Sequence, residues 1–166
     1  MKKHGVHTGM GKSHAGFSLI ELLVVVSIMS VLASIALPLT ELARRRNQEE
    51  ELRRALREIR TGIDTYKRLV DQGRIAKAAD ATGYPPSLEV LVEGVPDAQQ
   101  PQQRIYILRR LPRDPLASDN AVSNAGTWGL RSYASSPSDP QTGSDVFDVY
   151  SRAQGLSLSG TSYRSW

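Results

Sequence analysis

The chain has 166 residues, enough for about one domain, and an ordinary hydrophobic fraction of 40%. Its formal charge of +4 depends on Lys2, Lys3 and Lys12, because the rest of the chain carries 18 basic and 17 acidic side chains. Nucleic-acid binding needs clustered excess cations, and the nearly balanced charge of the rest of the chain therefore argues against it. Cysteine is absent and the three histidines all precede residue 16, which excludes disulfides, thiolate chemistry and, beyond residue 16, histidine-dependent catalysis. We therefore expect no cofactor and no enzyme.

The first distinctive element is an apolar run from Phe17 to Leu39, in which Glu21 is the only charged residue. A helix needs roughly 20 apolar residues to cross a bilayer, so the run is long enough. It fits a secretory signal cleaved near Ala36, a plain membrane anchor, or a helix that becomes the N-terminus once a short basic leader is removed. The apolar region of a secretory signal usually spans only about 7–15 residues, which disfavours the first interpretation. The basic residues before the run predict a cytoplasmic N-terminus by the positive-inside rule.

Two residues set this segment apart from a plain anchor. A carboxylate at the centre of a membrane helix costs about 2.5–3.5 kcal/mol, so Glu21 must either reach the interface or pair with another charge. Pro38 removes a backbone hydrogen bond and predicts a kink or local melting of the helix. It could also end the helix at the membrane surface. Helical periodicity resumes directly after Pro38, which favours the kink.

The next segment is predicted to be an amphipathic helix. Its apolar residues recur at spacings of three and four residues, which places them on one face: Leu52, Leu56, Ile59, Ile63, Tyr66 and Val70. The charged run 44–54 reads as a solvated face with glutamate–arginine pairs four residues apart. Gly73 supplies a helix stop. We expect the apolar stripe to pack against the chain's own C-terminal part rather than to form a coiled coil.

The C-terminal part is predicted to form a small antiparallel sheet that lies on the amphipathic half-helix. A rigid turn at 84–86 leads to a short helix capped by Ser87. Residues 94–104 are rich in Pro and Gln and read as a loop. The expected strands are 105–108, 127–134 and 146–151. The predicted fold class is α+β, with a long N-terminal helix that is membrane-spanning in its first half and amphipathic in its second half.

The segment that begins Gly16-Phe17-Ser18-Leu19-Ile20-Glu21 resembles the prepilin peptidase motif of type IV pilins and type II secretion pseudopilins. The resemblance implies cleavage between Gly16 and Phe17 and N-methylation of Phe17. It implies that Glu21 pairs with the N-terminal amine of a neighbouring subunit, and it puts Pro38 at a characteristic position. The expected domains are a leader at 1–16, an assembly helix at 17–39, its amphipathic continuation at 40–72 and a C-terminal domain at 73–166.

Further landmarks resemble the major pseudopilins of type II secretion, the general secretion pathway protein G family. They are Gly83-Tyr84-Pro85, Leu111-Pro112-Arg113-Asp114-Pro115, Tyr133 and Phe147-Asp148-Val149-Tyr150-Ser151. The resemblance implies a pilin-like subunit of a periplasmic secretion filament, held in the bacterial inner membrane by a single pass with its C-terminal domain in the periplasm. The implied partners are further copies of the chain, minor pseudopilins, prepilin peptidase and an inner-membrane assembly platform, without nucleic acid.

The alternative is a type IV pilus pilin, major or minor, for adhesion, motility or DNA uptake. Many major pilins close a C-terminal loop with a disulfide, so the lack of cysteine favours the pseudopilin.

The resemblance also implies a calcium site in an acidic, glycine-rich loop after the last strand. Calcium takes about six to eight oxygen ligands, several of them from carboxylates. Residues 152–166 contain no Asp or Glu, and strand alternation separates the preceding Asp145 and Asp148, with Asp139 further back. We therefore expect the calcium site to be absent or much weakened. Tyr163 and Trp166 are expected to close the loop by packing, with a disordered tail as the alternative.

Overall fold

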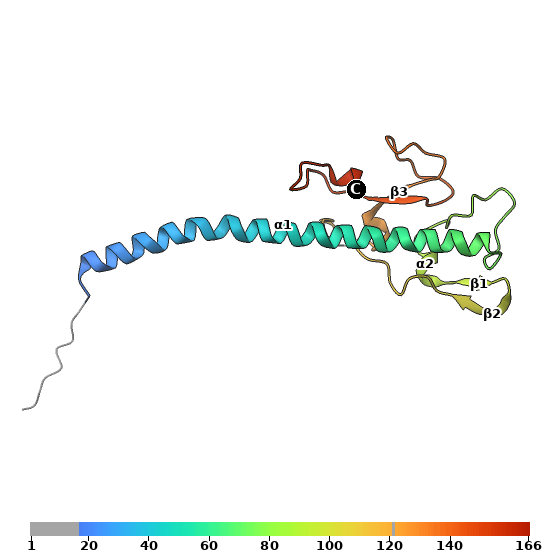
Figure 1. Cartoon of the computed structure of the whole chain (residues 1–166), viewed down its shortest axis with the longest axis horizontal. Coiled ribbons are helices and arrows are strands. Elements are labelled where there is room, and N and C mark those ends of the chain that lie inside the picture. The colour runs from blue at the N-terminus through green and yellow to red at the C-terminus, as the bar shows by residue number, and fades with distance from the viewer. Residues whose placement is uncertain (1–16, 121) are drawn as a thin grey trace, which may run out of the picture. The chain divides into compact units, whose positions relative to one another are not determined.

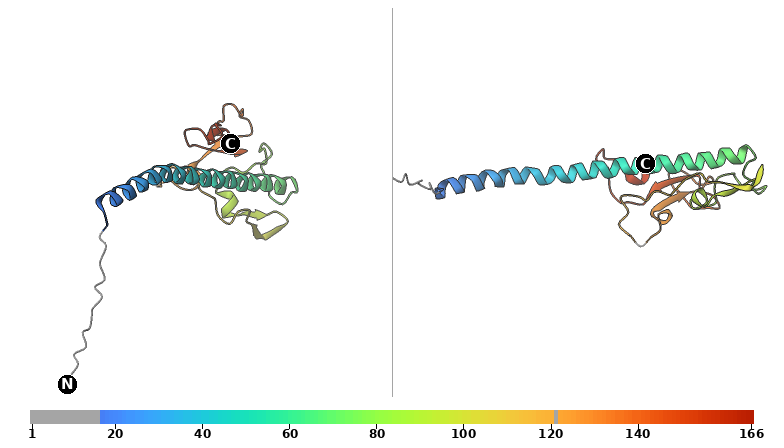
Figure 2. Two further views of the ribbon diagram at one scale, coloured as in Figure 1. Left: turned by 60° about the vertical axis from the view of Figure 1, so that its left-hand side comes forward. Right: turned by 90° about the horizontal axis from the view of Figure 1, so that it is seen from below.

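The computed structural model describes residues 17–120 and 122–166, and of residues 35–38 it describes the backbone alone. The described chain divides into two compact units between Leu42 and Ala43. The first unit contains the beginning of helix α1 (Leu19–Asp71). The second contains the rest of α1 and all the other elements, which lie along one face of the later turns of that helix (Figures 1 and 2).

Helix α1 ends at Asp71, and Gly73 supplies the stop that the sequence predicts. This glycine has a φ of 69°, a left-handed conformation in which a side chain would be strained. Its N–H donates to the carbonyl of Val70, and the N–H of Arg74 donates to that of Leu69, both at 2.9 Å. These two bonds form a Schellman motif, which satisfies carbonyls that the last helical turn leaves free.

The predicted apolar stripe of α1 is confirmed as the centre of the core. All six of its residues are buried, with Leu52 and Ile59 completely so. They pack against side chains from the rest of the second unit, among them Leu91, Trp128 and Val149. The short helix and the predicted strands 127–134 and 146–151 therefore contribute directly to covering the stripe, as the amphipathic pattern requires.

The short helix and the residues after it differ from the prediction. Helix α2 (Val90–Glu93) begins after Glu89, with no side-chain cap, so the prediction that Ser87 caps it is wrong. The predicted loop 94–104 is also wrong, because strands β1 (Val95–Asp97) and β2 (Gln100–Ile105) form an antiparallel hairpin there. The turn is built by the carboxylate of Asp97, whose Oδ1 accepts the N–H of Gln99 at 2.9 Å.

The expected strand 105–108 keeps only its first residue. The N–H groups of Ile107 and Leu108 donate to the carbonyl of Leu91 at 3.1 and 2.8 Å. These bonds draw the chain onto the end of α2 and out of the extended pairing with β1. Ile105 closes the strand opposite Val95.

A second antiparallel sheet is formed by β3 (Trp128–Arg131) and β4 (Asp148–Ser151). It lies inside the predicted strands 127–134 and 146–151, with Trp128 opposite Ser151 and Leu130 opposite Val149. The single antiparallel sheet predicted from the sequence is instead divided into two separate two-stranded sheets. Both lie against the second half of α1 in all three views (Figures 1 and 2).

Candidate assembly site

The first unit presents an apolar helical surface that nothing in the described chain covers. Every side chain from Phe17 to Ser34 is exposed, and Phe17 itself is 83% exposed. The described part of α1 is long and apolar enough to cross a membrane, and none of its apolar stretch is buried within the chain. Apolar surface costs roughly 25 cal/mol per Å² in water, so this helix requires lipid or other helices around it.

Three of the four serines of this segment add little polarity to that surface. The hydroxyls of Ser27, Ser30 and Ser34 each donate to the backbone carbonyl four residues earlier, at 2.7, 2.7 and 2.9 Å. A hydroxyl without a partner would be costly in lipid. Because each one bonds within its own helix, the segment stays compatible with an apolar environment.

Glu21 is the exception in this segment. It lies in the first turn of α1 and is exposed. Within residues 17–120 and 122–166 no cation pairs with its carboxylate. Its position near the positive end of the helix dipole is favourable for a negative charge. The described chain therefore offers a carboxylate that is available to a partner from outside.

Two other predicted site residues are not described in the same detail. Gly16 lies outside the described residues, so the structure does not bear on the cleavage position. Pro38 lies within the bounds of α1, but its side chain is outside the described part, so the kink stays a prediction.

In the second unit, Arg60 connects the long helix to β4 and the C-terminal residue. Its Nε donates to Oδ1 of Asp148 at 2.8 Å, and its Nη2 donates to the carbonyls of Val149 at 3.1 Å and Trp166 at 2.5 Å. Arg131 pairs with the other oxygen of Asp148 at 3.2 Å. One carboxylate is thus shared between two guanidinium groups, which fixes β4 against α1.

Two buried aspartates fasten the loops of this unit. Burial alone would raise the pKa of Asp145, but hydrogen bonds from Thr82, the Tyr133 N–H and Ser132 outweigh it and leave that pKa below its usual value. The pKa of Asp97 is lowered by its hydrogen bond from Arg74, aided by the Gln99 N–H. Both carboxylates are therefore held in the charged form at neutral pH.

The sequence landmarks that resemble the major pseudopilins come from distant parts of the chain and lie close together in the fold. The rings of Tyr84, Tyr133 and Phe147 form one cluster, with centroids 4.9–5.6 Å apart. The 111–115 segment is held by β3, because the indole N–H of Trp128 donates to the carbonyl of Pro112 at 2.9 Å. Asp114 is buried and accepts the hydroxyl of Ser151 at 2.6 Å. These landmarks build the scaffold of the second unit.

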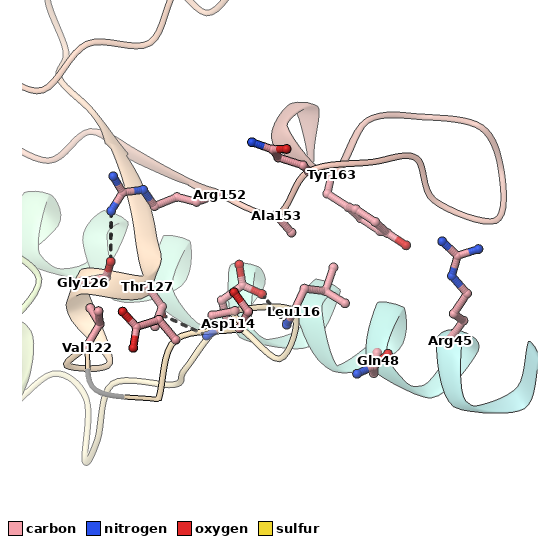
Figure 3. A pocket seen from close by; sticks show the side chains of 14 residues that line it. Arg45, Gln48, Asp114, Leu116, Val122, Gly126, Thr127, Arg152, Ala153 and Tyr163 are labelled. Carbon is pink, nitrogen blue, oxygen red and sulfur yellow. Dashed lines mark hydrogen bonds between the residues drawn. The ribbon is translucent and has the colours of Figure 1, made fainter. Parts of the chain in front are cut away.

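A cavity of about 640 Å³ lies beside the C-terminal segment and is lined by Arg45 and Gln48 of α1 together with Asp114, Arg152 and Tyr163 (Figure 3). Two of its lining groups, the Asp114 carboxylate and the Tyr163 phenol, are already engaged. Asp114 accepts the Leu116 N–H at 2.8 Å as well as Ser151, and the hydroxyl of Tyr163 donates to Glu49 at 2.9 Å. These groups serve the fold, and neither is free to act as a general acid or base.

Sequence reasoning missed Glu49. The run Glu49-Glu50-Glu51 reads as a solvated face, but Glu49 is only 4% exposed. Its expected pairing with Arg53 is present at a long 3.9 Å. The available signal was helical spacing, because Glu49 lies three residues before Leu52 and so on the edge of the apolar stripe.

The N-terminal part places the chain in a class. Residues 11–37 match the family model described as the prokaryotic N-terminal methylation motif. This match covers Gly16, Phe17, Glu21 and the exposed apolar surface described above, and the chain is type IV pilin-like in this part.

Longer similarity connects the chain to secretion proteins. It is 29% identical to the type II secretion system core protein G of Klebsiella michiganensis over 81% of this chain and 90% of that protein. It is 28% identical to the type II secretion system core protein G of Pectobacterium carotovorum over 72% of each chain. No solved structure is significantly similar to the chain. Along most of its length the chain therefore resembles the type II secretion pseudopilins.

Proposed function

We propose that this chain is a structural pseudopilin subunit that polymerises into the periplasmic filament of a type II protein secretion system after processing by prepilin peptidase. The observation that carries the proposal is the uncovered apolar half of α1, which coincides with the N-terminal methylation motif. Both secretion relatives match the chain well beyond that motif. They therefore favour the secretion filament over a type IV pilus.

In this proposal, cleavage after Gly16 frees the amine of Phe17, and a separate methyl-transfer step then N-methylates that amine. The apolar helix anchors the subunit in the inner membrane, with its N-terminus in the cytoplasm and the second unit in the periplasm. During assembly, Glu21 pairs with the Phe17 amine of a neighbouring subunit. Pairing offsets the cost of an isolated carboxylate in an apolar environment, about 2.5–3.5 kcal/mol at a helix centre, and so sets the register between subunits.

The role is association rather than catalysis. The relatives are named as core components of a secretion system. Copies of the chain, minor pseudopilins, prepilin peptidase and an inner-membrane assembly platform are the proposed partners. Energy for polymerisation would come from a separate component, because the sequence has no glycine-rich nucleotide motif.

Intact mass spectrometry of the membrane-extracted protein, with and without prepilin peptidase, tests the processing step. Loss of residues 1–16 with one added methyl group on Phe17 is expected. Cleavage near Ala36 would instead yield a secreted domain and overturn the proposal. An uncleaved chain in the presence of the peptidase would overturn it too.

The assembly step is tested with Glu21→Gln and the control Glu41→Gln, which changes an exposed carboxylate later in α1. Both variants should be inserted and processed, and only Glu21→Gln should lose sedimenting filaments. Filament formation equal to wild type in Glu21→Gln would refute the pairing. Deletion of the gene should abolish exoprotein release with surface pili intact, whereas loss of pili with secretion intact would favour the pilus alternative.

A further inference from the structure

We propose that Glu49 fastens the C-terminal segment Arg152–Trp166, in which the resemblance implies a calcium site, to α1 by direct hydrogen bonds. The segment then folds without a metal ion. This inference concerns the stability of the second unit and stands apart from the proposed filament.

The geometry at Glu49 is that of a buried acceptor with two donors. Its Oε1 accepts the backbone N–H of Leu158 at 2.7 Å and the hydroxyl of Tyr163 at 2.9 Å. These donors lie 109 and 114 residues further along the chain. Hydrogen bonds to a charged acceptor are about twice as strong as neutral ones, so one side chain can hold two points of the segment.

Between those two points the segment closes on itself. The N–H of Ser157 donates to the carbonyl of Thr161 at 2.8 Å, and the N–H of Gly160 donates back to Ser157 at 2.9 Å. The hydroxyls of Ser157, Ser159 and Thr161 lie 2.8–3.3 Å from one another. The turn is therefore satisfied by its own hydroxyls and backbone, and Glu49 joins it to the helix.

Aromatic packing completes the attachment. The rings of Tyr163 and Trp166 meet edge to face with centroids 5.4 Å apart, and the guanidinium of Arg53 lies 4.3 Å from the Trp166 ring. The side chain of Tyr163 points toward the helix, on the side where Arg45 lies (Figure 3). Burial, followed by the bond to Glu49, raises the pKa of Tyr163, so its phenol remains an O–H donor at neutral pH.

This donor set does not fit calcium. The ion takes about six to eight oxygens and relies on several carboxylates. The segment has no Asp or Glu, and Glu49 brings a single carboxylate whose Oε1 is already occupied by two donors. In the part of the chain that the structure describes, no three acidic or histidine side chains gather as a metal site. The hydroxyls that remain are neutral and bond to each other.

The test uses the full chain in detergent, as wild type and as Glu49→Ala, Glu49→Gln and the control Glu50→Ala, which removes the exposed neighbouring carboxylate. Each protein is measured with calcium and with EGTA. The first readout is the thermal midpoint. The second is amide hydrogen exchange at Leu158, which reports the proposed bond directly.

Wild type should have the same midpoint in calcium and in EGTA. Glu49→Ala should lower the midpoint by about 3–10 °C and reduce protection at Leu158 by about tenfold or more. Glu49→Gln keeps a neutral acceptor and should show a smaller drop in the midpoint and a smaller loss of Leu158 protection. It also provides the measurement if the alanine variant does not fold. Glu50→Ala should show neither. A wild-type midpoint that falls in EGTA, or unchanged Leu158 protection in both Glu49 variants, would overturn the proposal.

Discussion

Removal of the Arg60 guanidinium should loosen three parts of the second unit at once. Arg60→Ala deletes the bonds to Asp148, Val149 and Trp166. Asp148 keeps Arg131 and its contact with the Val149 N–H, so the variant does not leave an unpaired carboxylate. The Arg60 side chain is 38% exposed, so solvent weakens each bond. We therefore expect the free energy of unfolding to fall by about 2 kcal/mol, which is near the lower end of what three such hydrogen bonds contribute.

The assay is thermal unfolding of the full chain in detergent, followed by near-UV circular dichroism. A loss of about 2 kcal/mol corresponds to a midpoint about 4–8 °C lower. Arg60→Lys keeps the charge but not the planar fork and should lose about half as much. The control is Arg57→Ala, an exposed arginine one turn earlier, which should change stability by less than about 0.5 kcal/mol. Equal midpoints for Arg60→Ala and Arg57→Ala would refute the assignment of Arg60 as a connector.

Two further predictions concern the core and its carboxylates. Ile59→Ala, at a completely buried position, should destabilise the second unit by about 2–5 kcal/mol in urea unfolding, and an effect below 1 kcal/mol would contradict its place in the core. The pKa of Asp145 is depressed in the folded protein. Its ionised carboxylate therefore contributes fully to the free energy of unfolding above the unfolded-state pKa of about 3.9, and this contribution is lost as pH falls through the folded-state pKa. Unfolding free energy measured against pH should therefore decline below about pH 4 in wild type and decline less in Asp145→Asn, whereas parallel profiles would contradict this cause.

The apolar part of the fold could be predicted because it is periodic. The spacing of Leu52, Ile59 and Val70 is enough to place them on one face of a helix, and an apolar face of this kind is expected to be buried, as it is. The uncovered N-terminal segment could also be predicted, because its length and apolar composition are those of a helix that crosses a bilayer.

The polar connections could not be predicted in the same way. Glu49 and Arg60 occupy a helix crowded with charged residues, and their partners lie about a hundred residues away. Helical spacing puts Glu49 at the edge of the apolar stripe, but nothing in the local pattern identifies Tyr163 as its partner. The hairpin at 95–105 was missed for a related reason, because its strands lack β-branched residues in the middle and depend on the Asp97 turn.

The hydroxyls of Ser27, Ser30 and Ser34, which bond to carbonyls of their own helix, affect how the first half of α1 moves from lipid to contact with other proteins. A helix whose hydroxyls are satisfied internally gives up no hydrogen bond when its neighbour changes from a lipid tail to another protein helix. Both neighbours are apolar, so the exchange itself has little free-energy difference, and the fit between surfaces decides which neighbour is kept. Apart from Glu21, the described side chains of this segment therefore place no polar barrier on transfer of the helix between a bilayer and other helices, in either direction.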